Sequence, residues 1–151
     1  MKNLIIFLFA GLLLLGCGVS KTAYQQDSTS KITLNRGVCF GSCPYYDITI
    51  DGDGKAVFKG KKFVEKLGTF TKTFTPEETN LLFRKFEKAD FWSFADEYYA
   101  NVSDLPMNYI TLEHEGRSKK IKAYYNVPEA LTELMTEVDA YANTAGWKSA
   151  E

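Results

Sequence analysis

The sequence predicts one α+β domain, an antiparallel sheet with two helices packed on one of its faces. Segments that alternate apolar and polar residues, as half-buried strands do, come in two groups. Each group precedes a segment whose apolar residues recur every three or four positions, which is typical of an amphipathic helix. The resulting order of strands, helix, two strands and helix favours α+β over the regular alternation of a parallel α/β fold.

The first group of strands begins at Lys31. The sequence DGDG at residues 51–54 separates its second strand from a third over residues 55–59, and two glycines among two aspartates are typical of a hairpin turn. A calcium loop would need further spaced oxygens and a closing glutamate, and Phe63 sits twelve positions after Asp51, so we interpret the stretch as a turn. The apolar positions of the first two strands are Ile32, Leu34, Tyr46, Ile48 and Ile50.

The first helix is expected to follow a further strand around residues 64–74. Thr75 is typical of an N-cap, Pro76 of the first helical position, and Glu78 completes a capping box. Glu77 and Glu78 are therefore interpreted as a helix start and not as a catalytic pair. The helix is expected to bury Leu82, Phe83, Phe86 and Ala89, and the aromatic residues Phe91, Trp92 and Phe94 to plug the edge of the core.

The second group of strands is a hairpin over residues 108–113 and 119–125, with its turn at Glu115 and Gly116. A final helix then begins at Pro128 and Glu129 and stops before Gly146. Its apolar stripe consists of Leu131, Leu134, Met135, Val138 and Tyr141.

The N-terminus resembles a bacterial lipoprotein signal. One basic residue precedes an uncharged stretch at residues 4–15, which is too short to span a bilayer, and the stretch ends in the sequence LLGC at residues 14–17. The resemblance implies cleavage before Cys17 and lipidation of its thiol. We expect a signal peptide at 1–16, a lipidated tether at 17–30, one domain at 31–147 and a tail at 148–151.

The same resemblance predicts the location of the protein. No acidic residue follows Cys17 at positions 18–21, so nothing indicates retention in the inner membrane by the aspartate rule of enteric bacteria. We expect a lipid-anchored protein of the cell envelope, in the outer membrane and facing the periplasm. Removal of residues 1–16 leaves 17 basic and 19 acidic side chains, a balance that gives no electrostatic footprint for nucleic acid.

Two cysteines, Cys39 and Cys43, are expected to form a disulfide, because neighbouring thiols oxidise in the periplasm. Their Cα atoms would lie about 13 Å apart in an extended chain, whereas a disulfide needs less than about 7 Å, so the chain must bend between them. Gly41 and Ser42 are turn residues, and Pro44 prevents a helix from continuing.

An alternative is a thiol-redox or copper protein that uses Cys39, Cys43 and His114. Two thiolates and an imidazole form a soft ligand set for copper. The copper chaperones of cytochrome oxidase assembly, which the Cys-x3-Cys-Pro pattern resembles, use two such cysteines and a distant histidine. Those proteins are thioredoxin-like, however, and in this sequence strands lie on both sides of the motif.

Catalytic groups are not apparent, so we expect no enzyme activity and no cofactor other than copper in that alternative. His114 is the sole histidine, and Ser42 and Ser118 lack the context of a nucleophile elbow or a helix start. No glycine-rich loop opens a helix to bind phosphate.

The cysteine stretch also carries a resemblance to a family of small lipoproteins, common in Bacteroidota, whose domain has no known function. The resemblance extends over residues 31–142 and implies a compartment and a fold but no activity. It rests on Arg36, the sequence CFGSCP at residues 39–44, Tyr46, the turn at Asp53 and Gly54, Gly60, and the sequence SDLP at residues 103–106.

The expected function is a non-enzymatic, lipid-anchored module that binds an envelope protein or a glycan. Paired tyrosines at 45–46, 98–99 and 124–125 support a binding surface, because one of two successive residues in a strand must face away from the core. We expect Tyr45, Tyr99 and Tyr124 to form that surface, since tyrosine is common at binding interfaces.

Overall fold

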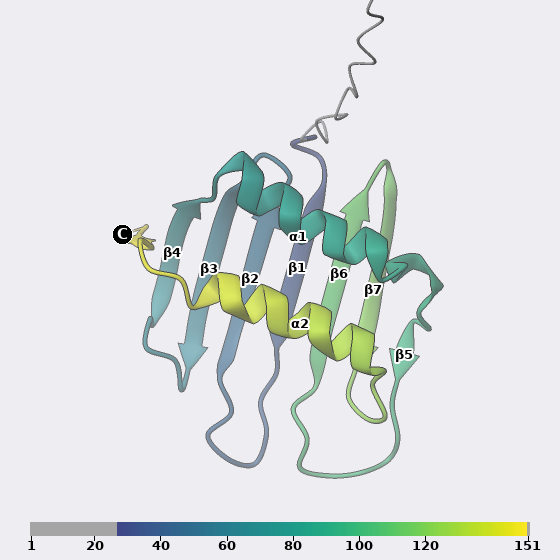
Figure 1. The fold of residues 1–151 in the computed structure, drawn as a ribbon. Coiled ribbons are helices and arrows are strands. Elements are labelled where there is room, and N and C mark those ends of the chain that lie inside the picture. The colour runs from purple at the N-terminus through teal and green to yellow at the C-terminus, as the bar shows by residue number, and fades with distance from the viewer. Residues whose placement is uncertain (1–26, 151) are drawn as a thin grey trace, which may run out of the picture.

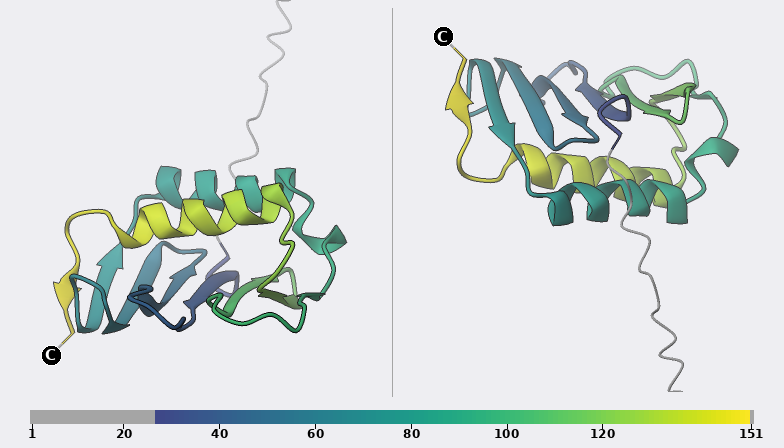
Figure 2. Two further views of the ribbon diagram at one scale, coloured as in Figure 1. Left: turned by 90° about the horizontal axis from the view of Figure 1, so that it is seen from below. Right: turned by 90° about the horizontal axis from the view of Figure 1, so that it is seen from above.

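The computed structural model describes residues 27–150, which form one open sheet with two helices across one of its faces (Figures 1 and 2). The α+β prediction is therefore confirmed. The order of the strands in the sheet is β5-β7-β6-β1-β2-β3-β4-β8. The strands are β1 (Lys31–Arg36), β2 (Tyr45–Asp51), β3 (Lys55–Lys62), β4 (Gly68–Thr73), β5 (Glu97–Tyr98), β6 (Asn108–His114), β7 (Arg117–Ala123) and β8 (Lys148–Ser149), and the helices are α1 (Pro76–Lys88), α2 (Glu129–Ala142) and a short 3-10 helix at Phe91–Ser93.

The central strand β1 pairs antiparallel with both β2 and β6, so it joins the two predicted hairpins into one sheet. Several boundaries differ from the prediction. Strand β7 spans Arg117–Ala123 where residues 119–125 were expected, so Tyr124 and Tyr125 lie beyond its end. The third strand runs on to Lys62, and the fourth begins only at Gly68, because residues 63–67 form the loop between them. The two-residue strands β5 and β8 were not predicted, since so short a strand shows no alternation.

The helices pack as their sequences indicate. Both capping-box bonds of α1 are present: the Glu78 amide donates to Thr75 Oγ1 (3.2 Å) and the Thr75 amide to Glu78 Oε2 (2.8 Å). Phe91 is fully buried at the edge of the core, as expected. No helix among residues 27–150 is long and apolar enough to cross a membrane. The core between helices and sheet includes Ile32, Leu34, Ile48, Ile50, Leu82, Phe86, Ile110, Ile121, Leu131 and Val138.

The two ends of the strands differ in what they carry. One end of the sheet is where the chain enters β1, and we call it the N-terminal end. There a turn at residues 27–30 packs against the β2–β3 turn, and the Gly52 amide donates to the Ser30 carbonyl (2.7 Å). At the opposite end, which we call the loop end, the connections 37–44, 63–67, 99–107 and 124–128 gather (Figure 1). The candidate site lies at the loop end.

Candidate functional site

The predicted disulfide joins Cys39 and Cys43 in the β1–β2 loop, with their Cα atoms 5.8 Å apart. The Gly41 amide donates to Cys39 Sγ (3.3 Å), so the turn residues between the cysteines make the expected bend. Phe40 is carried at the tip of this loop and is 91% exposed. The crosslink therefore holds a large apolar side chain in solvent at the loop end.

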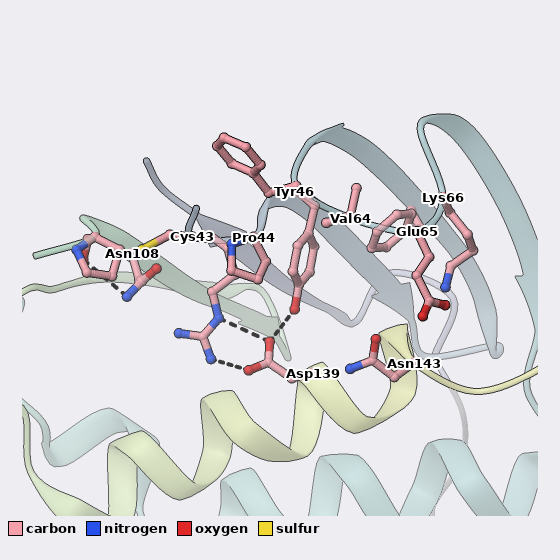
Figure 3. Close-up of a pocket in the computed structure, with 13 residues that line it drawn as sticks. Cys43, Pro44, Tyr46, Val64, Glu65, Lys66, Asn108, Asp139 and Asn143 are labelled. Carbon is pink, nitrogen blue, oxygen red and sulfur yellow. Dashed lines mark hydrogen bonds and ion pairs between the residues drawn. The ribbon is translucent and has the colours of Figure 1, made fainter. Parts of the chain in front are cut away.

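A pocket of about 420 Å³ opens beside this loop (Figure 3). Cys43 and Pro44 form one side of it, Val64 and Glu65 of the β3–β4 loop form another, and Asn143 closes it beyond the end of α2. The pocket thus lies where the disulfide loop, the sheet and α2 meet.

An ionic cluster of Arg36, Tyr46 and Asp139 lines the pocket (Figure 3). Arg36 donates two hydrogen bonds to the Asp139 carboxylate, from Nε to Oδ1 (3.0 Å) and from Nη2 to Oδ2, and the Tyr46 hydroxyl donates to Oδ1. Such a bidentate contact between a guanidinium and a carboxylate is among the stronger ion pairs in proteins. The cluster fastens α2 to the ends of β1 and β2.

The environment of the cluster shifts the pKa of two of its members. Burial opposes the charge of Arg36, but the hydrogen bonds and negative charge of Asp139 outweigh it, so the pKa of Arg36 is raised. Burial, and then the hydrogen bond and charge of Asp139, raise the pKa of Tyr46 far above that of free tyrosine. At neutral pH Arg36 is therefore a cation and Tyr46 a neutral phenol.

Exposed large apolar side chains are concentrated at the loop end. Nine occur among residues 27–150, and Leu81 on α1 alone lies away from this end. Scattered apolar residues are normal on a protein surface, but a group at one end of a domain is typical of an interaction site. The other eight are Val38, Phe40, Phe63, Leu67, Tyr99, Val102, Leu105 and Tyr125.

The structure does not bring His114 to the two cysteines. His114 ends β6 at the N-terminal end of the sheet, where Ser30 Oγ lies 2.7 Å from its Nδ1, whereas Cys39 and Cys43 follow the other end of β1. A six-residue strand separates the two places by about 20 Å. Within residues 27–150 no three His, Cys, Asp or Glu side chains are grouped as metal ligands.

The tyrosines of the expected surface lie on or beside the face of the sheet that the helices leave open. Tyr45 points away from the core that contains Tyr46, and Lys61 Nζ lies 4.5 Å from the centre of its ring. Tyr99 and Tyr124 stack with ring centres 5.4 Å apart. The Tyr124 hydroxyl donates to the Val102 carbonyl (2.5 Å), so this ring is held in place. Cys17, the expected lipidation site, lies outside the described residues.

Asp139 was missed by the sequence reasoning. It flanks the apolar stripe of α2, where a polar residue needs no special role, and its two partners lie 93 and 103 positions away in the chain. Arg36 was singled out only through the family resemblance, and Tyr46 only as a core residue.

Cys43→Ser is expected to lower the free energy of unfolding by about 2 kcal/mol, because the disulfide closes a short loop and so restricts the unfolded chain only modestly. Urea unfolding of the variant and of the oxidised and reduced wild type would measure this. The reduced wild type should have the same free energy of unfolding as the variant. The expectation would be contradicted if the oxidised wild type were no more stable than these two.

Above about pH 10 the Tyr46→Phe variant is expected to lose less unfolding free energy with rising pH than the wild type does. There an unfolded tyrosine releases its proton, whereas folded Tyr46 keeps it because its pKa is raised. The unfolded state then binds fewer protons, so stability falls as pH rises, by up to about 1.4 kcal/mol per pH unit. Phenylalanine has no such proton, while Tyr141, with a pKa raised to about 12, acts alike in both proteins. Urea unfolding of both proteins at pH 9 and pH 11 measures the loss. An equal loss of unfolding free energy in the two proteins between these pH values would contradict the expectation.

Comparison with known proteins shows the family. The family model described as a domain of unknown function, DUF6438, matches residues 30–142, which include both hairpins, both helices and the disulfide loop. No curated protein matches the sequence. Since the matched region is most of the 151-residue chain, the protein belongs to the DUF6438 family, a domain of unknown function.

Proposed function

We propose that this protein is a lipoprotein of the cell envelope, anchored through Cys17 in the outer membrane and facing the periplasm, whose domain binds another envelope protein at its loop end. The domain acts by binding and not by catalysis. The family itself supplies no activity, so the proposal depends on what the loop end presents.

The observation that carries the proposal is the group of exposed apolar side chains at that end. Eight of the nine such side chains among residues 27–150 belong to its four loops. Leaving Phe40 91% exposed, at the tip of a crosslinked loop, gains nothing for folding. A few buried side chains, among which aromatic ones are enriched, supply most of the energy of protein interfaces, and Phe40 and Phe63 are aromatic anchors of that kind.

The position of the tether agrees with this function. The chain enters the domain at Asp27, beside the β2–β3 turn, and the loop end lies at the other end of the strands, about 20 Å away. An anchor that precedes Asp27 therefore leaves the loop end accessible to a partner.

The loop end is also preorganised, which reduces the entropy lost on binding. The disulfide fixes the β1–β2 loop, and the cluster of Arg36, Tyr46 and Asp139 fixes α2 against the sheet beneath it. The pocket between them has apolar walls from Pro44 and Val64, and Asp139 balances its arginine charge. It fits an apolar side chain of the partner.

Site-specific photo-crosslinking in the cells that make the protein tests the proposal. A photoreactive phenylalanine analogue is placed at Phe40, at Leu105 or, as a control with a similarly exposed apolar side chain, at Leu81 (56% exposed). The expected result is one protein adduct of the same mass from positions 40 and 105 and none from 81. Equal adducts from all three positions, or none from the loop end, would refute the proposal.

A further inference from the structure

We propose that the open face of the sheet binds an acidic polysaccharide. This site goes beyond the protein partner of the loop end and shares only Tyr99 and Tyr124 with it. The open face consists of the strand side chains that alternate with the buried ones and point away from the helices, together with Tyr99 and Tyr124 beside them.

Positive charge is in excess on the open face. It carries seven lysines against four acidic residues, although the whole chain has a net charge of −1. On the opposite side, α2 carries four acidic residues and no basic one, and α1 carries three of each. The charged residues of the open face are Lys31, Lys55, Lys59, Lys61, Lys120, Lys122, Lys148, Asp47, Asp51, Glu97 and Glu113. An anionic ligand is therefore attracted to this face and repelled by α2.

The acidic residues of the open face are largely neutralised within it. Asp47 pairs with Lys61 (2.7 Å), Glu97 with Lys122 (3.0 Å) and Asp51 with Lys31 (3.8 Å). Lysines beyond these pairs, such as Lys59 and Lys120, supply the excess of positive charge.

Three tyrosine rings on this face each lie beside a lysine. The ammonium nitrogens of Lys61, Lys120 and Lys122 lie 4.5, 4.4 and 3.8 Å from the ring centres of Tyr45, Tyr109 and Tyr99. Lys61 and Lys122 also contact Asp47 and Glu97, whereas Lys120 lies outside those ion pairs, so the Lys120–Tyr109 pair offers an anion-binding group beside a ring with a hydroxyl. An acidic sugar fits such a pair, because its carboxylate or sulfate can contact the lysine while its C–H edge packs on the ring.

Hydroxyl groups form a row across the middle of the face. Thr111, Thr33 and Thr49 are direct neighbours in the register of β6, β1 and β2, and Thr71 of β4 follows beyond Val57. Neighbouring strands lie about 4.8 Å apart, so the row repeats at short, regular intervals. A threonine hydroxyl both donates and accepts a hydrogen bond, as the hydroxyl groups of a sugar chain do.

Two hollows lie along this face. One, of about 400 Å³, is lined by Tyr45, Tyr109, Lys61 and Lys120 among others. The second, of about 620 Å³, includes Lys55, Lys148 and Thr71 in its lining. A ligand chain that crossed the strands along the threonine row would reach both hollows, which favours a polymer over a small anion.

The chemistry of the face favours a polysaccharide over an acidic protein. Protein interfaces have an apolar centre and few lysines. Among residues 27–150, Tyr99 is the one exposed large apolar side chain that lies on the open face. Lysine, threonine and tyrosine dominate it instead.

The test uses the full mature chain, purified in detergent from membranes, and measures its binding to polygalacturonate, with neutral dextran as the reference polymer. One variant carries Lys59→Gln, Lys120→Gln and Lys148→Gln. Its control removes the same charge from α1, by Arg84→Gln, Lys85→Gln and Lys88→Gln. Thermal unfolding checks that both variants are folded.

The expected result is salt-sensitive binding to polygalacturonate and not to dextran, weakened about tenfold or more in the open-face variant and less than about twofold in the control. Tyr109→Ala should weaken binding without a change in charge. Equal weakening in the two triple variants would show a mere effect of net charge and overturn the proposal, as would absence of binding at low salt. Binding to polyglutamate or to anionic vesicles that is as tight as to polygalacturonate would overturn the assignment to a polysaccharide.

Discussion

Asp139→Ala is expected to lower the free energy of unfolding by about 3 kcal/mol. The substitution leaves the Arg36 guanidinium, whose side chain is only 20% exposed, without its counter-charge, and it removes the acceptor of the Tyr46 hydroxyl. Loss of one partner of a buried ion pair typically costs about 3–5 kcal/mol, and the partial exposure of this pair reduces the cost.

Urea unfolding followed by tryptophan fluorescence measures this effect, because Trp147 packs beside the core residues Phe58 and Phe74. The matched control is Glu137→Ala on the same helix, which breaks the more exposed pair with Lys85 and should cost less than about 1 kcal/mol. Similar losses in the two variants would mean that the cluster does not fasten α2 to the sheet.

Gly60→Ala is expected to cost about 2 kcal/mol, because a β-carbon at this position would lie only 1.7 Å from the carbonyl oxygen of Lys66. The backbone of the loop 63–67 must then move away from β3. Since this loop forms one wall of the pocket, the substitution should also alter the loop end.

Gly41→Ala is the control for this substitution. Its new β-carbon would meet nothing closer than Cys39 Sγ at 3.9 Å, so its effect should stay within about 0.5 kcal/mol. Urea unfolding gives the two stabilities, and amide chemical shifts of residues 63–67 report the movement of the loop. If Gly60→Ala changed neither the stability nor these chemical shifts, the Lys66 carbonyl would not lie as close to position 60 as the structure places it.

The elements of the fold were predictable because their signals are local. The capping box at Thr75 and Glu78 marks the start of α1, and alternation in residues 45–51 places Tyr46 on the buried side of β2. The disulfide was also predictable, because the bend that it needs lies between the two cysteines themselves.

The candidate site was not predictable, because it depends on how distant segments meet. Arg36 and Asp139 are 103 residues apart, and nothing in the stripe of α2 indicates that a residue beside it faces an arginine of β1. The gathering of four loops at one end, and the positive charge of the open face, follow from the order of the strands. That order is a property of the whole chain.

The central claim is that the mature protein is an exported, lipid-anchored domain with an oxidised loop at the end remote from its anchor. Intact-mass spectrometry of the protein purified from envelopes, with thiol alkylation before and after reduction, tests it most directly. The predicted result is a chain that begins at Cys17, carries acyl groups on that residue, and exposes the thiols of Cys39 and Cys43 only after reduction. An unmodified chain that still begins at Met1 and has free thiols would contradict the claim.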